Sequence, residues 1–130
     1  MHDYSLRGSV AIVDDEESVR LSLRRLFGAM GFCATTYASG PELIAALERG
    51  AARPDCLVLD ARMPAMTGLE VHRDLVARNL RVPTVVYTAD DAPEAKTRYL
   101  SAGILEYLHK PIGAEELVAA IERAIGGRCT

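Results

Sequence analysis

The sequence predicts one α/β domain in which a doubly wound, five-stranded parallel sheet is covered by helices on both faces. Short apolar segments alternate with longer amphipathic segments five times along the 130 residues. Three of the short segments are continuously apolar, which is typical of parallel strands buried on both faces. Alternating strands and helices imply right-handed crossovers. Because there is no internal repeat, low-complexity segment or linker, we expect residues 1–130 to form a single domain.

Five segments rich in β-branched and aromatic residues are the expected strands. In chain order they are 9–14, 33–37, 56–60, 83–88 and 104–110. The second and fifth mix polar with apolar residues, so we expect one or both of them at a sheet edge.

The intervening segments carry helical periods and helix-start signals. The first helix is predicted by an apolar stripe followed by Gly31, and the stripe comprises Val19, Leu23, Leu26, Phe27 and Met30. The next three begin with capping-box patterns, in which Ser39, Thr67 and Asp91 each precede a Glu by three residues. A last helix has its stripe at Leu117, Ile121 and Ile125 and is expected to end at Gly126 and Gly127.

Composition and charge favour a soluble protein and disfavour two classes of partner. The chain is 49% hydrophobic and 25% charged, with a net charge of −3, which argues against direct nucleic-acid binding. It contains neither a signal-peptide pattern nor an apolar segment long enough to cross a membrane. The cysteines lack metal-ligand spacing, so we expect Cys33 and Cys56 to be buried, reduced thiols in a cytoplasmic protein.

Polar side chains stand at the carboxyl ends of four expected strands. Asp14 and Asp15 end the first, Asp60 the third, Thr88 the fourth and Lys110 the fifth. In an open α/β sheet the carboxyl ends of the strands form the ligand site. Carboxylates and a phosphate oxygen are the ligands that Mg²⁺ prefers, and an ammonium adds a second positive charge. The combination predicts a site where a phosphoryl group is accepted.

Four motifs in this order and spacing resemble the receiver domain of bacterial two-component response regulators. They are IVDDEESVR (12–20), CLVLDARMPAMTGLE (56–70), VVYTA (85–89) and YLHKPI (107–112). The resemblance covers essentially the whole chain, and the sequence around these motifs is most similar to receivers of nitrogen-fixation and nodulation regulators. It implies the (βα)5 flavodoxin-like receiver fold with strand order 2-1-3-4-5 and no output domain within residues 1–130.

The resemblance also implies roles for individual residues. Asp60 is the expected phosphoacceptor for a sensor histidine kinase or a phosphotransfer protein. Asp15 and Asp60 are expected to bind Mg²⁺ (or Mn²⁺) directly, Asp14 through water, and Arg62 through its backbone carbonyl. The domain is then not an enzyme in the ordinary sense, since it catalyses only its own phosphorylation and dephosphorylation.

A conformational switch is implied in the same way. Thr88 and Lys110 are expected to contact the phosphoryl oxygens, and Tyr107 occupies the position of the switch aromatic. The face formed by residues 91–125 is expected to change shape and to control a partner, dimerisation or an output domain.

One position departs from the common pattern of these domains. Arg62 replaces a small or polar residue two places after the phosphoacceptor, and Asp90 lies two residues after Thr88. We hypothesise that an Arg62–Asp90 contact shields the acyl phosphate and lengthens its lifetime.

Simpler interpretations remain open for each residue. Asp14 and Asp15 could only stabilise a helix N-terminus, Thr88 could be a turn hydroxyl and Tyr107 a core aromatic. For the whole domain, the alternatives are a pseudo-receiver that binds partners without phosphorylation and a Mg²⁺-dependent small-molecule phosphatase with an aspartyl nucleophile.

Overall fold

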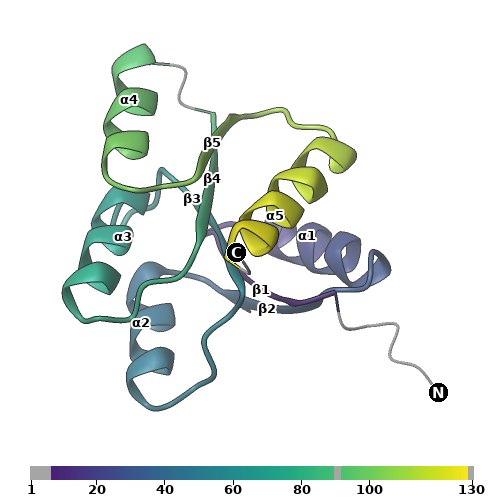
Figure 1. Ribbon diagram of the computed structural model, residues 1–130, viewed down its shortest axis with the longest axis horizontal. Helices are drawn as coiled ribbons and strands as arrows, with labels where there is room; N and C mark the ends of the chain where they lie inside the picture. Colours follow the sequence, from purple (N-terminus) through teal and green to yellow (C-terminus); the bar gives the residue numbers. More distant parts are fainter. Residues whose placement is uncertain (1–6, 90–91, 129–130) are drawn as a thin grey trace.

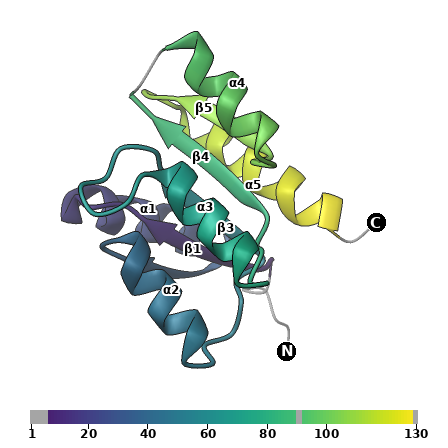
Figure 2. The same cartoon turned by 90° about the vertical axis from the view of Figure 1, so that its left-hand side faces the viewer.

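Five parallel strands lie side by side through the centre of the molecule, with helices on both faces (Figures 1 and 2). The computed structural model describes residues 7–89 and 92–128. The strands are β1 (Ser9–Val13), β2 (Cys33–Tyr37), β3 (Cys56–Asp60), β4 (Thr84–Thr88) and β5 (Glu106–His109). Their order in the sheet is β2-β1-β3-β4-β5, so the predicted fold class and strand order are confirmed.

Each crossover between consecutive strands contains one helix, and a fifth helix follows β5. The helices are α1 (Glu17–Ala29), α2 (Gly40–Glu48), α3 (Gly68–Ala77), α4 (Pro93–Ser101) and α5 (Ala114–Arg128). Figure 1 shows α1 and α5 on one face of the sheet and α2, α3 and α4 on the other.

The two faces of the sheet build two separate cores because successive strand residues point to opposite sides. In β3, Leu57 and Leu59 pack on the side of α2 to α4, whereas Cys56 and Val58 pack on the side of α1 and α5. All five residues of β3 are buried. This double burial explains why the central strands are continuously apolar in the sequence.

Both mixed strands lie at the sheet edges, as their composition indicated. At the β2 edge the prediction for one cysteine was wrong, because the Cys33 side chain is exposed. An edge strand has neighbours on one side only, so an apolar sequence there does not guarantee burial. Cys56 is a buried free thiol as expected, and burial raises its pKa to about 12.

The helix starts agree with the sequence in part. At α3 the predicted capping box is complete, with Thr67 and Glu70 each bonded to the other's backbone N–H. At α2, Ser39 accepts from the Glu42 N–H, but the Glu42 carboxylate accepts from Ala38 instead.

Two predicted helix ends need correction and one is confirmed. The N-cap of α4 is Ala92, with no side-chain cap, whereas the predicted cap Asp91 lies outside the described residues. Helix α5 continues past Gly126 to Arg128 instead of ending at the glycine pair. Gly31 follows α1 with φ +94°, the left-handed conformation expected after a helix end.

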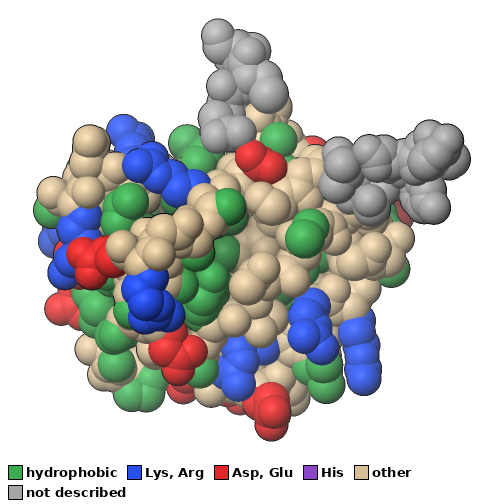
Figure 3. All heavy atoms as spheres, turned by 90° about the horizontal axis from the view of Figure 1, so that it is seen from below, with side chains coloured by type: hydrophobic (Ala, Val, Ile, Leu, Met, Phe, Trp, Pro, Cys, Tyr) green, Lys and Arg blue, Asp and Glu red, His purple; other side chains and the backbone are tan. Residues whose placement is uncertain are grey.

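The surface mixes charges with small apolar areas. On the face in Figure 3, basic side chains form several separate groups with acidic ones between them. Within the described residues, every helix is too short or too polar to cross a membrane.

The start of α2 packs tightly on α3, which makes glycine necessary at one position. A Cβ on Gly40 would overlap with Cγ2 of Val71, whereas a Cβ on Gly28 in α1 would have no atom within 4 Å. We expect Gly40→Ala to lower the free energy of unfolding by about 1–3 kcal/mol through overpacking. Gly28→Ala should raise it by about 0.5 kcal/mol through helix propensity. Urea denaturation measures both changes.

A double-mutant cycle identifies the cause of the Gly40 effect. Gly40→Ala should cost clearly less in a Val71→Ala background than in the wild type. An equal cost in both backgrounds would contradict the packing explanation.

Candidate functional site

The carboxyl ends of β1, β3 and β5 bring four charged residues to one end of the sheet. One carboxylate oxygen from each of Asp14, Asp15 and Asp60 lies within 4.8 Å of the other two. The Lys110 Nζ lies 3.9 Å from Asp14 Oδ2 and 4.0 Å from Asp60 Oδ1. Thr88 ends β4, the strand between β3 and β5. The predicted convergence of Asp14, Asp15, Asp60 and Lys110 is therefore observed, and Thr88 lies at the same end of the sheet.

The acids differ in exposure, and their crowding has an electrostatic cost. Asp14 is 0% exposed and Asp60 is 6% exposed, whereas Asp15 is exposed. Burial and, to a smaller extent, repulsion from Asp14 together raise the pKa of Asp60 to about 6, against the opposing effect of Lys110. One ammonium, from Lys110, lies beside three acidic side chains, so negative charge exceeds positive charge in the cluster.

Two backbone N–H groups and one arginine side chain hold the two buried acids in place. Asp14 Oδ1 accepts from the Glu16 N–H at 2.9 Å, and Arg20 donates to the Asp14 carbonyl at 2.8 Å. Asp60 Oδ1 accepts from the Arg62 N–H at 3.3 Å. The N-cap of α1 is Glu16, with no side-chain cap bond. Asp14 therefore stabilises the segment that leads into α1, and its side chain is also part of the acidic cluster.

Glycine at position 68 allows the start of α3 to approach the end of β3, which carries Asp60. A Cβ there would lie 3.0 Å from the Asp60 carbonyl oxygen and 3.1 Å from Cα of Ala61. The Gly68 N–H also donates to the Ala61 carbonyl at 3.0 Å. These contacts connect the loop after Asp60 to a capped helix.

Tyr87 is a site residue that sequence reasoning missed. Its hydroxyl donates a hydrogen bond to Asp14 Oδ2, and the Lys110 Nζ lies 4.4 Å from the centre of its ring. Burial and the bond to Asp14 raise its pKa, so the hydroxyl remains a neutral donor. Strand alternation could have placed Tyr87 on the α1 and α5 side of the sheet. It could not have predicted that the hydroxyl binds Asp14, which is 73 positions away in the sequence.

Tyr107 lies in the core on the α2 to α4 side of the sheet, against α4. It is 9% exposed, and its ring centre lies 5.3 Å from that of Tyr99. The Tyr99 hydroxyl accepts from the Leu69 N–H at 3.2 Å, which connects α4 to the start of α3. The core interpretation thus describes the present position of Tyr107, and its switch role stays a prediction.

Arg62 lies at the entrance to the site. It lines a hollow of about 540 Å³ together with Asp15, Met63, Arg98 and Tyr99. Asp90 lies outside the described residues, so its hypothesised contact with Arg62 stays a prediction.

The donor set fits a hard divalent cation. Carboxylate oxygens are the ligands that Mg²⁺ prefers, and a cation here would offset the repulsion that raises the pKa of Asp60. Of the three acids, exposed Asp15 keeps the most freedom to bind directly, because both Asp14 oxygens already accept hydrogen bonds.

Removing the Asp60 charge should stabilise the metal-free protein. Because the pKa in the folded state, about 6, is above the ordinary value of 3.8, stability falls as pH rises through this range and stays lower above it. We expect Asp60→Asn to raise the free energy of unfolding by about 1–3 kcal/mol near neutral pH without divalent metal. Urea denaturation near pH 4 should show little of this gain.

The control is Asp74→Asn, which removes an acid that is paired with Arg78 on α3, away from the cluster. It should give no gain at either pH. If Asp60→Asn is no more stable than the wild type near neutral pH, burial and repulsion do not destabilise the ionised Asp60 as described above.

Comparison with known proteins identifies the family. The sequence profile of the response regulator receiver domain matches residues 10–122. The transcriptional regulator NtrC of Salmonella typhimurium is 38% identical over 119 residues, which are 92% of this chain and 25% of NtrC. The response regulator MprA of Mycobacterium ulcerans is 42% identical over 111 residues, which are 85% of this chain and 47% of MprA.

A solved structure agrees in both fold and sequence. FixJ-N superposes with a TM-score of 0.83 at 33% identity, covering 97% of this chain and 96% of FixJ-N. The chain spans about a quarter of NtrC and about half of MprA, so the matches concern this domain and not the whole of those proteins. With its profile, relatives and strand order in agreement, the chain belongs to the receiver domain family of two-component response regulators.

Proposed function

We propose that this receiver domain accepts a phosphoryl group on Asp60 from the phosphohistidine of a sensor histidine kinase or a phosphotransfer protein. The observation that carries the proposal is the buried Asp60 carboxylate, 4.0 Å from Lys110 and clustered with Asp14 and Asp15. With a pKa of about 6, Asp60 is mostly ionised at neutral pH and can act as a nucleophile. Its oxygen attacks phosphorus while the bond from phosphorus to the histidine nitrogen breaks.

Mg²⁺, or Mn²⁺ in its place, would be held by Asp15 and Asp60 directly, by Asp14 through water and by the Arg62 carbonyl. When bound, the cation supplies positive charge to the transferring phosphoryl oxygens. Lys110 contributes a second positive charge, and Thr88 a hydrogen bond. The domain is not an enzyme acting on other substrates: it promotes only its own phosphorylation and dephosphorylation. A contact between Arg62 and Asp90 at the site entrance, if formed, would slow hydrolysis of the acyl phosphate.

Phosphorylation would then act as a switch. Added charge at Asp60 draws Thr88 toward the phosphoryl group, and Tyr107 moves into the space this leaves. The face of residues 91–125, which contains α4, β5 and most of α5, shifts between two pre-existing states. This face would bind a partner protein, a second copy of the chain or an output domain.

The partners of the domain are proposed to be proteins. A net charge of −3 and the dispersed basic groups of Figure 3 are unlike a nucleic-acid-binding surface. NtrC is a DNA-binding regulator, but this chain matches only a quarter of it. A cytoplasmic location, away from membranes, fits a kinase-phosphorylated receiver.

Phosphorylation can be tested by intact mass after incubation with acetyl phosphate. We expect wild type to gain one phosphoryl group with Mg²⁺ and none after Mg²⁺ is removed by a chelator. Asp60→Asn should gain nothing, whereas the control Asp74→Asn should behave as wild type. A gain that persists in Asp60→Asn would place the phosphoacceptor elsewhere. No gain in folded wild type would favour a phosphorylation-independent binding module.

Tyr87→Phe should change cation binding at the acids. Loss of the hydroxyl leaves the buried Asp14 carboxylate with one hydrogen-bond donor fewer. The metal-free protein is then less stable, and a bound cation stabilises it by a larger amount than it stabilises the wild type. We expect Mg²⁺ to bind about three- to ten-fold more tightly by calorimetry. The control Tyr37→Phe, at the end of β2, should leave the affinity unchanged. A fall in stability with unaltered Mg²⁺ affinity would mean that Tyr87 only supports the fold.

A further inference from the structure

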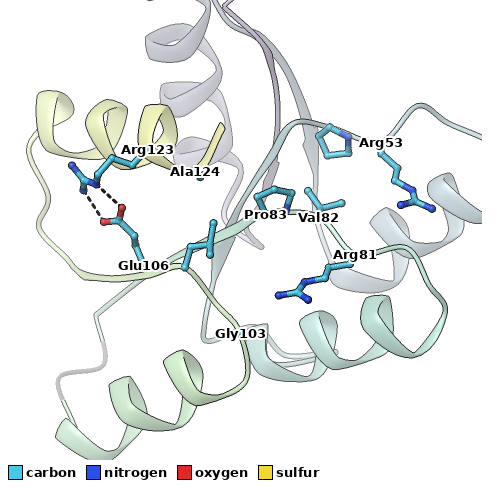
Figure 4. Close-up of a pocket in the computed structure, with 10 residues that line it drawn as sticks. Arg53, Arg81, Val82, Pro83, Gly103, Glu106, Arg123 and Ala124 are labelled. Atoms are coloured by element: carbon cyan, nitrogen blue, oxygen red, sulfur yellow. Dashed lines mark hydrogen bonds and ion pairs between the residues drawn. The ribbon is translucent and has the colours of Figure 1, made fainter. Parts of the chain in front are cut away.

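A second cavity lies at the opposite end of the sheet from the acidic cluster. It has a volume of about 530 Å³ and is bounded by the segments that lead into β3, β4 and β5 and by one turn of α5 (Figure 4). Its walls therefore stand at the amino ends of the strands, whereas Asp60, Thr88 and Lys110 stand at the carboxyl ends. The proposed phosphoryl transfer makes no use of this space.

The floor of the cavity is apolar. Val82 and Ala124 are 2% and 3% exposed, and Pro54 and Pro83 complete the lining. Leu105, at the mouth, leaves 48% of its surface exposed although it is a large apolar residue. This surface can bury the hydrocarbon part of a ligand, and its volume falls in the range of small-molecule sites.

Three arginines border this floor, and two of them already have partners. Arg123 forms two bonds with Glu106, at 2.6 and 2.7 Å (Figure 4). Arg53 donates to the carbonyl of Asn79 at 2.9 Å. Among the described residues that line the cavity, the one acid is Glu106, and it is engaged by Arg123.

Arg81 is different, because its guanidinium has no carboxylate within ion-pair distance among residues 7–89 and 92–128. Figure 4 shows its side chain reaching across the cavity between Pro83 and Gly103. Its Nη2 lies 3.3 Å from the position that a Cβ on Gly103 would occupy, so the absence of a side chain there leaves room for it. A planar donor group thus stands over an apolar floor without an anionic partner.

We propose that this cavity binds a small organic carboxylate with an apolar body. The carboxylate pairs with the Arg81 guanidinium, whose donors match it in bidentate geometry. The apolar body lies on Val82, Pro83 and Leu105. The excess of positive charge, three arginines against Glu106, selects an anion over a neutral or cationic ligand. The proposal does not depend on phosphorylation of Asp60.

Occupancy would give the domain a second input. Leu105 and Glu106 lead directly into Tyr107 in β5, and Ala124 and Arg123 belong to α5. A ligand here therefore touches the two elements that carry the proposed output face.

The test is an amide NMR titration of the unphosphorylated protein with 4-phenylbutyrate as the probe. Saturable shifts are expected at Val82, Gly103 and Leu105, with the amides of Asp15 and Asp60 unaffected. Arg81→Gln should weaken binding about ten-fold, the loss expected for one charge-assisted pair. Arg73→Gln is the control, since it removes an exposed arginine of α3 outside the cavity. Thermal unfolding of both variants checks that they remain folded.

Two further probes separate the charge from the apolar body. Acetate, which keeps the carboxylate, and 4-phenylbutanol, which keeps the ring, should each bind at least about ten-fold more weakly. Leu105→Ala should also weaken binding of 4-phenylbutyrate. The proposal is overturned by equal affinity in Arg81→Gln and Arg73→Gln, by equally tight binding of inorganic phosphate at these amides, or by the absence of saturable shifts.

Discussion

Repulsion among three carboxylates at one end of the sheet is the constraint on which the rest of this structure depends. Two of them, Asp14 and Asp60, are nearly inaccessible to water, and a single ammonium from Lys110 lies close to both. Such an arrangement is unfavourable for an isolated fold. Under the proposed function it becomes useful, because the carboxylates would attract a cation, and that cation and Lys110 would then hold an anionic phosphoryl group. The proposal therefore places the stability cost at the site where the domain would act.

The fold maintains this arrangement from several directions. The carboxyl ends of parallel strands lie at the same end of the sheet. Residues that are distant in the sequence therefore meet there without a dedicated loop. The Tyr87 ring lies beneath Lys110 while its hydroxyl binds Asp14, which connects the ammonium to an acid through one side chain. Gly68 allows α3 to approach the Asp60 backbone closely. The switch proposed for Thr88 and Tyr107 needs these fixed contacts. A small movement of the two side chains can alter the surface only if the residues around them stay in place.

Much of this could be predicted from the sequence, for reasons that particular residues make clear. Continuous apolar strands and polar strand ends are local signals, and they located Asp14, Asp60 and Lys110 correctly. The Tyr87 hydrogen bond and the Arg81 cavity arise from packing between distant segments, for which the sequence has no local sign. The predictions that were wrong depended on the three-dimensional surroundings of a residue. Cys33 lies on an edge strand, and α5 continues through Gly126 because a glycine in a helix costs only about 1 kcal/mol.

The most direct test of the central claim is to locate a paramagnetic cation. Mn²⁺ takes oxygen ligands as Mg²⁺ does, and it broadens the amide signals around its binding site. The account predicts selective broadening at the ends of β1, β3, β4 and β5, centred on Asp15 and Asp60, with the amides at Gly103 and Leu105 sharp. Excess Mg²⁺ should reverse the broadening. Broadening spread over exposed acids such as Glu115 and Glu116, or none at the strand ends, would contradict a cation site there.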